Sequence, residues 1–344
     1  MITPRSPYDG YPRAVPRVVL ALVMLFDTGV VIMNQWSAHL SAASHPMAPA
    51  WLVAPGGRPW LLLTVGALIA VALFLFARRP GALWPGVAAL LGVGYLVEGH
   101  GAMLEGPQRF LFAGGVAMLG WVLSLAYARW TGLDAVAGEV RAGYGAPALL
   151  AATYINAFTS KMSTSGLEWF NPDALRSVVL TQHPLNRPQW AHQYAMLIAE
   201  HASIAGVLVV LTLIAQASAF FYAWSPRNRA VSATLLLSFH ANTAILTPFF
   251  FPQTMSLLLA LSFPWARGVA ALRGRGPDPR YTEQPTVDRE RRDRVRKRML
   301  LGAAALVAFA WLPSPITRYT RLHHRHGTGS AEPDQGPPRG HKRR

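Results

Sequence analysis

The sequence predicts an all-α fold, a polytopic transmembrane bundle of about eight spans, and two observations support that prediction. Hydrophobic residues make up 52% of the 344 residues, whereas charged residues make up only 14%, below the roughly 25% typical of soluble domains. The hydrophobic residues also fall in runs of about 17 to 25, the length that a helix needs to cross a bilayer core of ~30 Å. Each run must be helical, because a bilayer offers no water to open backbone groups.

The first apolar run is expected to be a retained span and not a signal peptide. Arg5, Arg13 and Arg17 precede it, Asp27 interrupts it, and no small-residue cleavage site follows a short apolar region. A polar stretch rich in proline and tryptophan, 163–190, separates the fifth run from the sixth. In chain order, the eight predicted spans are 18–36, 59–77, 83–104, 109–128, 145–161, 192–222, 230–264 and 299–316.

The run 230–264 is too long for one simple crossing. Pro248 and Pro252 interrupt it, so it forms either two short helices or a re-entrant hairpin. With a cytoplasmic N-terminus, a single crossing would place the segment 267–298 outside, although that segment carries eleven Lys and Arg residues. Basic loops favour the cytoplasmic side. We therefore expect this element to cross twice or to fold back.

These features divide the chain into five parts. We expect a basic N-terminal segment 1–17, a transmembrane bundle 18–265, a basic cytoplasmic linker 266–298, a final transmembrane helix 299–316 and a disordered basic tail 317–344. The net charge of +16 is concentrated outside the spans, where arginine sets topology or meets anionic lipid head groups. The expected partners thus include membrane lipids and no nucleic acid. The absence of cysteine excludes disulfides, thiolate metal sites and cysteine nucleophiles.

Several polar residues lie inside the predicted spans, where a charged side chain costs about 2.5–3.5 kcal/mol on insertion scales. Each one has a structural as well as a functional interpretation. Asp27 suits a partner for a cation in the bundle, Lys161 a snorkelling anchor, and His240 a hydrogen-bonded structural histidine. Alternatively, the groups meet in a cavity that opens toward the outer half of the membrane. The residues concerned are Asp27, Glu98, His100, Lys161, Glu200, His201, His240 and Asn242.

The chemistry that such a set would suit is proton transfer. A desolvated lysine can act as a general base near neutral pH. A nearby histidine or carboxylate can orient a substrate or relay the proton. No Ser-His-Asp spacing, zinc signature or nucleotide motif competes with this interpretation, and no metal site is predicted.

Two segments resemble a known family. The stretch Tyr154-Ile155-Asn156-Ala157-Phe158-Thr159-Ser160-Lys161, followed by Trp169, is similar to a segment of vitamin K-dependent gamma-carboxylase and its bacterial relatives, the HTTM-domain membrane proteins. The later stretch from Ser238-Phe239-His240 through Phe249-Phe250-Phe251 and Met255 to Phe263-Pro264-Trp265 resembles the family's second signature. An acidic helix with Glu200 lies between the two, in the family's order. The resemblance covers roughly 15–265.

The resemblance implies a set of site residues and a cofactor. Lys161 would be the base that deprotonates a reduced quinone of the vitamin K type, and His240 would orient or relay. Glu200 and His100 are weaker catalytic candidates. Tyr154, Trp169 and Phe239 would contact the quinone. The family's chemistry then removes a proton from a glutamate of a peptide or protein substrate, to which carbon dioxide adds.

Two departures separate this chain from the carboxylase. The large soluble region that engages the substrate protein there is replaced by a short linker, one span and a tail, and Lys161 follows Ser160. Three functions therefore stand as hypotheses: a quinol-using, carboxylase-like enzyme, a non-enzymatic membrane partner, assembly or export factor, and a proton-coupled transporter that uses Asp27, Glu200 and His240. The resemblance implies a multi-pass protein of a bacterial inner membrane.

Overall fold

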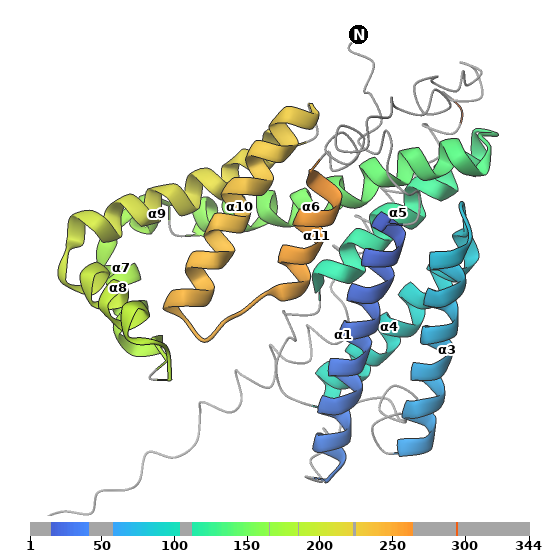
Figure 1. Cartoon of the computed structure of the whole chain (residues 1–344), viewed down its shortest axis with the longest axis horizontal. Coiled ribbons are helices and arrows are strands. Elements are labelled where there is room, and N and C mark those ends of the chain that lie inside the picture. Colours follow the sequence, from blue (N-terminus) through green and yellow to red (C-terminus); the bar gives the residue numbers. More distant parts are fainter. Residues whose placement is uncertain are drawn as a thin grey trace, which may run out of the picture. The chain divides into compact units, whose positions relative to one another are not determined.

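A computed structural model describes residues 15–40, 58–103, 112–164, 166–184, 186–222, 225–263 and 294, and every secondary-structure element in them is helical, as predicted (Figure 1). The predicted linker (Arg294 apart), final helix and tail lie outside these residues. The α-helices are α1 Val15–Leu40, α3 Pro59–Arg78, α4 Leu83–Met103, α5 Phe112–Trp130, α6 Ala135–Thr164, α7 Pro172–Gln182, α8 Gln189–Glu200, α9 Ala202–Ala217, α10 Pro226–Leu246 and α11 Pro252–Ser262. Two 3-10 helices are η2 Gly166–Phe170 and η3 Ser218–Phe221.

Three of the described helical segments are long and apolar enough to cross a membrane. They are Val15–Ser37 in α1, Pro59–Arg78 in α3 and Ala202–Phe221, which joins α9 to η3. The apolar part of α4, Leu83–Glu98, is shorter. These helices support the prediction of a membrane protein, while the number of eight spans stays a prediction.

The predicted run 192–222 is not one helix, which corrects the sequence-based expectation. Helix α8 ends at Glu200, and His201 takes an extended conformation with φ −113° and ψ 98° before α9 begins. The carbonyl groups at this helix end find partners outside the helical pattern. His201 Nδ1 lies 3.0 Å from the Leu197 carbonyl oxygen, and Arg176 Nε donates to the Ala199 carbonyl oxygen at 2.7 Å. Such bonds satisfy a helix C-terminus and stabilise the break.

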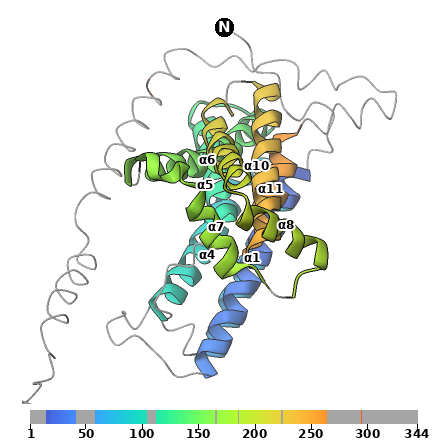
Figure 2. The same ribbon diagram turned by 90° about the vertical axis from the view of Figure 1, so that its left-hand side faces the viewer.

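The predicted interruption of 230–264 is confirmed. Helix α10 begins after the N-cap Ser225, whose hydroxyl oxygen accepts from the backbone N–H of Asn228, and it ends at Leu246. Non-helical residues 247–251 follow, and Pro252 takes the first position of α11, where its missing N–H has no helical partner to lose. The α10 and α11 helices pack against each other (Figure 2).

The N-terminal helices α1, α3, α4 and α5 pack around a core of large apolar side chains. Phe76 and Trp121 meet edge to face in it, with ring centroids 6.0 Å apart. Helices α5 and α6 come closest at Gly120 and Gly145, where a Cβ on either residue would collide with the other helix. Small residues permit such close approach of membrane helices. This contact fixes the side of α6 that faces the N-terminal helices.

A second, smaller apolar cluster joins α7, α8 and α9 to the end of α10. Its buried residues include Val179, Ile198, Ala205 and Leu246. In Figure 1, α7 and α8 are drawn in light green beside the yellow-green α9. Helices α9 and α11 and the 3-10 helix η3 all contact α6, which therefore lies between the two clusters.

Candidate functional site

One face of α6 carries two of the residues that the sequence singled out, Tyr154 and Lys161, with Phe158 between them. Tyr154, Phe158 and Lys161 stand four and three residues apart, so they follow one another along a single face of the helix. Seven residues of helix rise separate Tyr154 from Lys161 by about 10 Å along the axis. We call these three residues the α6 stripe.

At the buried end of the α6 stripe, Tyr154 is paired with His240 of α10. The Tyr154 hydroxyl oxygen lies 2.6 Å from His240 Nε2, and both side chains are buried. Either atom can be the donor, depending on the tautomer of the imidazole. The bond joins α6 to α10 through two residues that are 86 positions apart in the sequence.

The second ring nitrogen of His240 has no hydrogen-bond partner. His240 is only 6% exposed, and its Nδ1 atom is buried without a donor or acceptor. Its surroundings are aromatic, because the rings of Phe239 and Phe251 have centroids 5.0 and 5.3 Å from that of the imidazole. A buried polar atom without a partner costs about 1–3 kcal/mol. It therefore marks a place where a hydroxyl or carbonyl group would be stabilised.

At the other end of the stripe, Lys161 lies half-buried between an amide and an indole. Its Nζ donates to Gln216 Oε1 of α9 at 2.8 Å and lies 5.1 Å from the ring centroid of Trp169 in η2. Gln216 is itself buried. The described residues contain no carboxylate that pairs with Lys161. Its polar partners are thus neutral groups.

One aromatic pair lies along α6 between the two ends of the stripe. Phe158 meets Phe220 of η3 edge to face, with ring centroids 6.2 Å apart. A polar group at each end with aromatic rings between them suits a flat, mainly apolar molecule with polar edges.

Polar contacts hold the ends of the elements that carry the stripe's partners. Tyr194 of α8 donates through its hydroxyl to Asn242 Oδ1 of α10 at 2.9 Å. His183 and His192 approach within 2.9 Å through Nε2 and Nδ1, and His183 Nδ1 lies 3.3 Å from the Leu246 carbonyl oxygen. These bonds anchor the end of α10 next to the 247–251 break.

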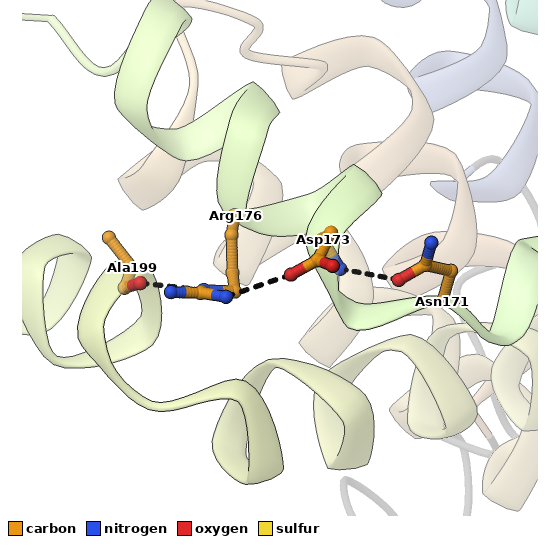
Figure 3. Close-up of polar contacts among 4 residues, drawn as sticks. All are labelled: Asn171, Asp173, Arg176 and Ala199. Atoms are coloured by element: carbon orange, nitrogen blue, oxygen red, sulfur yellow. Dashed lines mark hydrogen bonds and ion pairs between the residues drawn. The ribbon is translucent and has the colours of Figure 1, made fainter.

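A second set of contacts fixes the chain directly after Trp169 (Figure 3). The Asn171 side chain caps α7 by accepting from the Asp173 backbone N–H at 2.9 Å. Arg176 donates to Asp173 at 2.8 Å and to the Ala199 carbonyl oxygen at 2.7 Å. Because Ala199 is near the C-terminus of α8, one arginine ties the start of α7 to the break before α9 and so helps to place Trp169.

Of the other predicted site residues, Glu200 is not brought to the stripe. It is exposed at the C-terminus of α8, and Glu98 is exposed on α4. The sequence placed Glu200 inside a continuous span, and the break at His201 makes that expectation wrong. The His100 side chain lies outside the described residues.

Two partners of the site were missed from the sequence. Gln216 is a lone amide in an apolar helix, and that signal was visible in the sequence. Phe251, which lies against His240, stands in the aromatic run 249–251 noted in the sequence but received no site role, because only the turn at 247–251 brings its ring back to α10. Among the described residues, no group of three or more His, Cys, Asp or Glu is arranged to hold a metal ion.

No family model matches this chain, and neither a curated protein nor a solved structure is significantly similar to it.

Proposed function

We propose that the chain is a multi-pass membrane enzyme that uses Lys161 as a general base toward a quinol-type substrate entering from the bilayer. The proposal extends the resemblance to the membrane part of the vitamin K-dependent gamma-carboxylase family. A bound reduced quinone would supply a hydroxyl group, and the quinone would react with oxygen once that hydroxyl is deprotonated.

The observation that carries the proposal is the pair of neutral partners around Lys161. Gln216 accepts one N–H bond at 2.8 Å, and Trp169 presents its ring at 5.1 Å. A carboxylate in place of the amide would hold the ammonium form and oppose proton removal from a substrate. An amide orients the amine without adding a negative charge, which suits a lysine that must lose and regain a proton.

The far end of the stripe supports the same substrate class. His240 Nδ1 is buried and without a partner, whereas Nε2 is fixed by Tyr154 at 2.6 Å. A histidine whose ring is oriented by one nitrogen can bind a substrate oxygen with the other. The aromatic rings of Phe158, Phe239 and Phe251 offer apolar surface for a flat ring.

The membrane arrangement belongs to the proposal as well. Three helical segments are long and apolar enough to span a membrane, and the sequence contains further apolar runs. We propose that together they make about eight spans, with the N-terminus in the cytoplasm. The basic linker 266–298 then lies on the cytoplasmic side of a bacterial inner membrane. The residues around Lys161 face the outer half of that membrane.

Oxygen consumption by the purified protein with a reduced naphthoquinone tests this function. We expect turnover by the wild type and its loss in Lys161→Ala. Lys297→Ala is the matched control, because it removes a lysine from the predicted linker and leaves the stripe intact. All three proteins must first be shown to be folded in detergent at the assay temperature by a cooperative thermal transition above it.

Each outcome of this assay supports or refutes the role of Lys161 as the base. Turnover that survives in Lys161→Ala would show that another group is the base. A wild type that consumes no oxygen with reduced benzoquinones or naphthoquinones would refute the quinol proposal and favour the non-enzymatic partner hypothesis. Loss of turnover in Lys297→Ala would mean that the assay reports the net charge of the protein and not the stripe.

A further inference from the structure

Asp27 is a second buried polar site, on a helix that the proposed function does not use. It is the thirteenth of the 26 residues of α1 and lies in the middle of the spanning segment Val15–Ser37. The residue is only 1% exposed, and its carboxyl group has no charged partner, only the nearby Gln253 amide. An acidic side chain in such a place needs either a cation or a proton.

Among the side chains that the structure describes on the helices around Asp27, no cation is paired with its carboxyl group. Helices α3, α4, α5 and α11 all pack against α1, and every basic residue on these five helices lies in a terminal turn. Arg17, about 15 Å away along the α1 axis, already forms an ion pair with Glu139 of α6. The other ionisable residues on these helices are His39, Arg78, Tyr95, Glu98, His100, Tyr127 and Arg129, and α11 has none.

The immediate surroundings of Asp27 come from α5 and α11. A Cβ built on Gly114 would lie 2.6 Å from Asp27 Oδ2, so the backbone of α5 closes directly over the carboxyl group. Gln253, in the first turn of α11, is the polar side chain beside it. The structure thus places a mid-span carboxyl next to the first turn of a short helix that follows a break.

The positive end of the α11 dipole attracts a carboxylate, but this interaction is weaker than the penalty for burying an unpaired ion. A hard metal cation would need about six oxygen ligands. Beside the two carboxyl oxygens, the site offers the Gln253 amide, whereas the neighbouring Thr28 hydroxyl donates to the Met24 carbonyl oxygen at 2.7 Å. A proton needs neither space nor further ligands.

We infer that Asp27 is a reversible proton-binding site in the middle of the membrane bundle, enclosed by α1, α5 and the first turn of α11. The carboxylic acid form fits the dry contact with Gly114, and release of the proton requires the first turn of α11 to move or to admit water. The inference is independent of the proposed role of Lys161.

Covalent labelling with dicyclohexylcarbodiimide tests the inference on the full-length protein in liposomes. This apolar reagent adds to a protonated carboxyl group: the acid proton moves to a nitrogen and the oxygen bonds to the central carbon, after which the acyl group migrates to nitrogen with no atom lost. We expect mass spectrometry to locate the adduct on Asp27. Labelling should slow as the pH rises, and Asp27→Asn should abolish it.

Two controls make the result decisive. Asp134→Asn should leave the adduct unchanged, because Asp134 is exposed and caps α6 by accepting from the Ala137 backbone N–H at 2.7 Å. An infrared difference spectrum between wild type and Asp27→Asn should contain the carbonyl band of one carboxylic acid. Absence of both adduct and band would overturn the inference. Protection of Asp27 by sodium at constant pH would overturn it in favour of a cation site.

Discussion

The two polar contacts on the α6 stripe differ in their burial and in the chemistry that they permit. Tyr154 and His240 are both almost fully enclosed and share one short hydrogen bond. Lys161 is half-buried, and its indole partner Trp169 is 37% exposed. The first contact joins α6 to α10 inside the core, whereas the second joins α6 to α9 and to η2 at its edge.

The difference in burial suits the first contact to holding a side chain in place and the second to proton transfer. A dry, hydrogen-bonded tyrosine–histidine pair has one arrangement, so it suits an element that fixes a helix and presents one ring nitrogen. A half-exposed lysine with neutral partners can exchange protons with a substrate or with water. In the proposed function, Tyr154 and His240 would therefore position the substrate, and Lys161 would transfer the proton.

Removing the buried bond should have the largest effect on stability. We expect Tyr154→Phe to lower the free energy of unfolding by about 1–2 kcal/mol, because it leaves His240 Nε2 as well as Nδ1 without a partner. Denaturant unfolding in detergent measures it. The double variant Tyr154→Phe/His240→Leu should lose less than the sum of the single changes. Strict additivity would show that the two side chains do not interact.

Gln216→Leu should have the next largest effect, about 1 kcal/mol, since it removes the acceptor of a charge-assisted bond to a half-buried ammonium. Gln216→Glu separates stability from function. It should retain stability through an ion pair but reduce quinol turnover, because the new carboxylate favours the charged lysine. If Gln216→Glu turned over quinol as fast as the wild type, the neutral partners of Lys161 would not be needed for its action as a base.

Trp169→Leu should lower stability by about 0.5–1 kcal/mol, the range for a cation–π contact at a partly exposed site. Trp169→Phe is the matched variant, because it keeps an aromatic face and should recover most of the loss. Thermal unfolding of the three proteins in one detergent gives the order. If phenylalanine and leucine behave alike, Trp169 contributes apolar contact and no interaction with the charge.

Glu200→Gln should have the smallest effect, within about 0.5 kcal/mol of the wild type, with quinol turnover unchanged. The reason is its exposed position at the end of α8, away from the stripe. Turnover assays and thermal unfolding both check this outcome. Loss of turnover in Glu200→Gln would restore the carboxylate to the site and would require α8 to move toward α6.

Much of the fold was predictable because apolar run length is a local property. The four runs before residue 130 correspond to α1, α3, α4 and α5, and the interruption at Pro248 and Pro252 appears where the sequence placed it. The break between α8 and α9 was not predictable from hydropathy. At this break, Arg176 of α7 donates to the Ala199 carbonyl oxygen from 23 positions away, a contact that hydropathy does not encode.

The sequence by itself determined the class of the protein and named both ends of the stripe, since a membrane forces apolar runs into helices and makes each buried polar residue conspicuous. It could not assign partners. Only the packing of α6 against α9, α10 and η2 pairs Lys161 with Gln216 and Trp169, and Tyr154 with His240. The physical reason is that the periodicity of a sequence gives the face of a helix on which a residue lies. Which side chain of another helix contacts that residue depends on how the helices pack, for example at the close contact of Gly120 with Gly145.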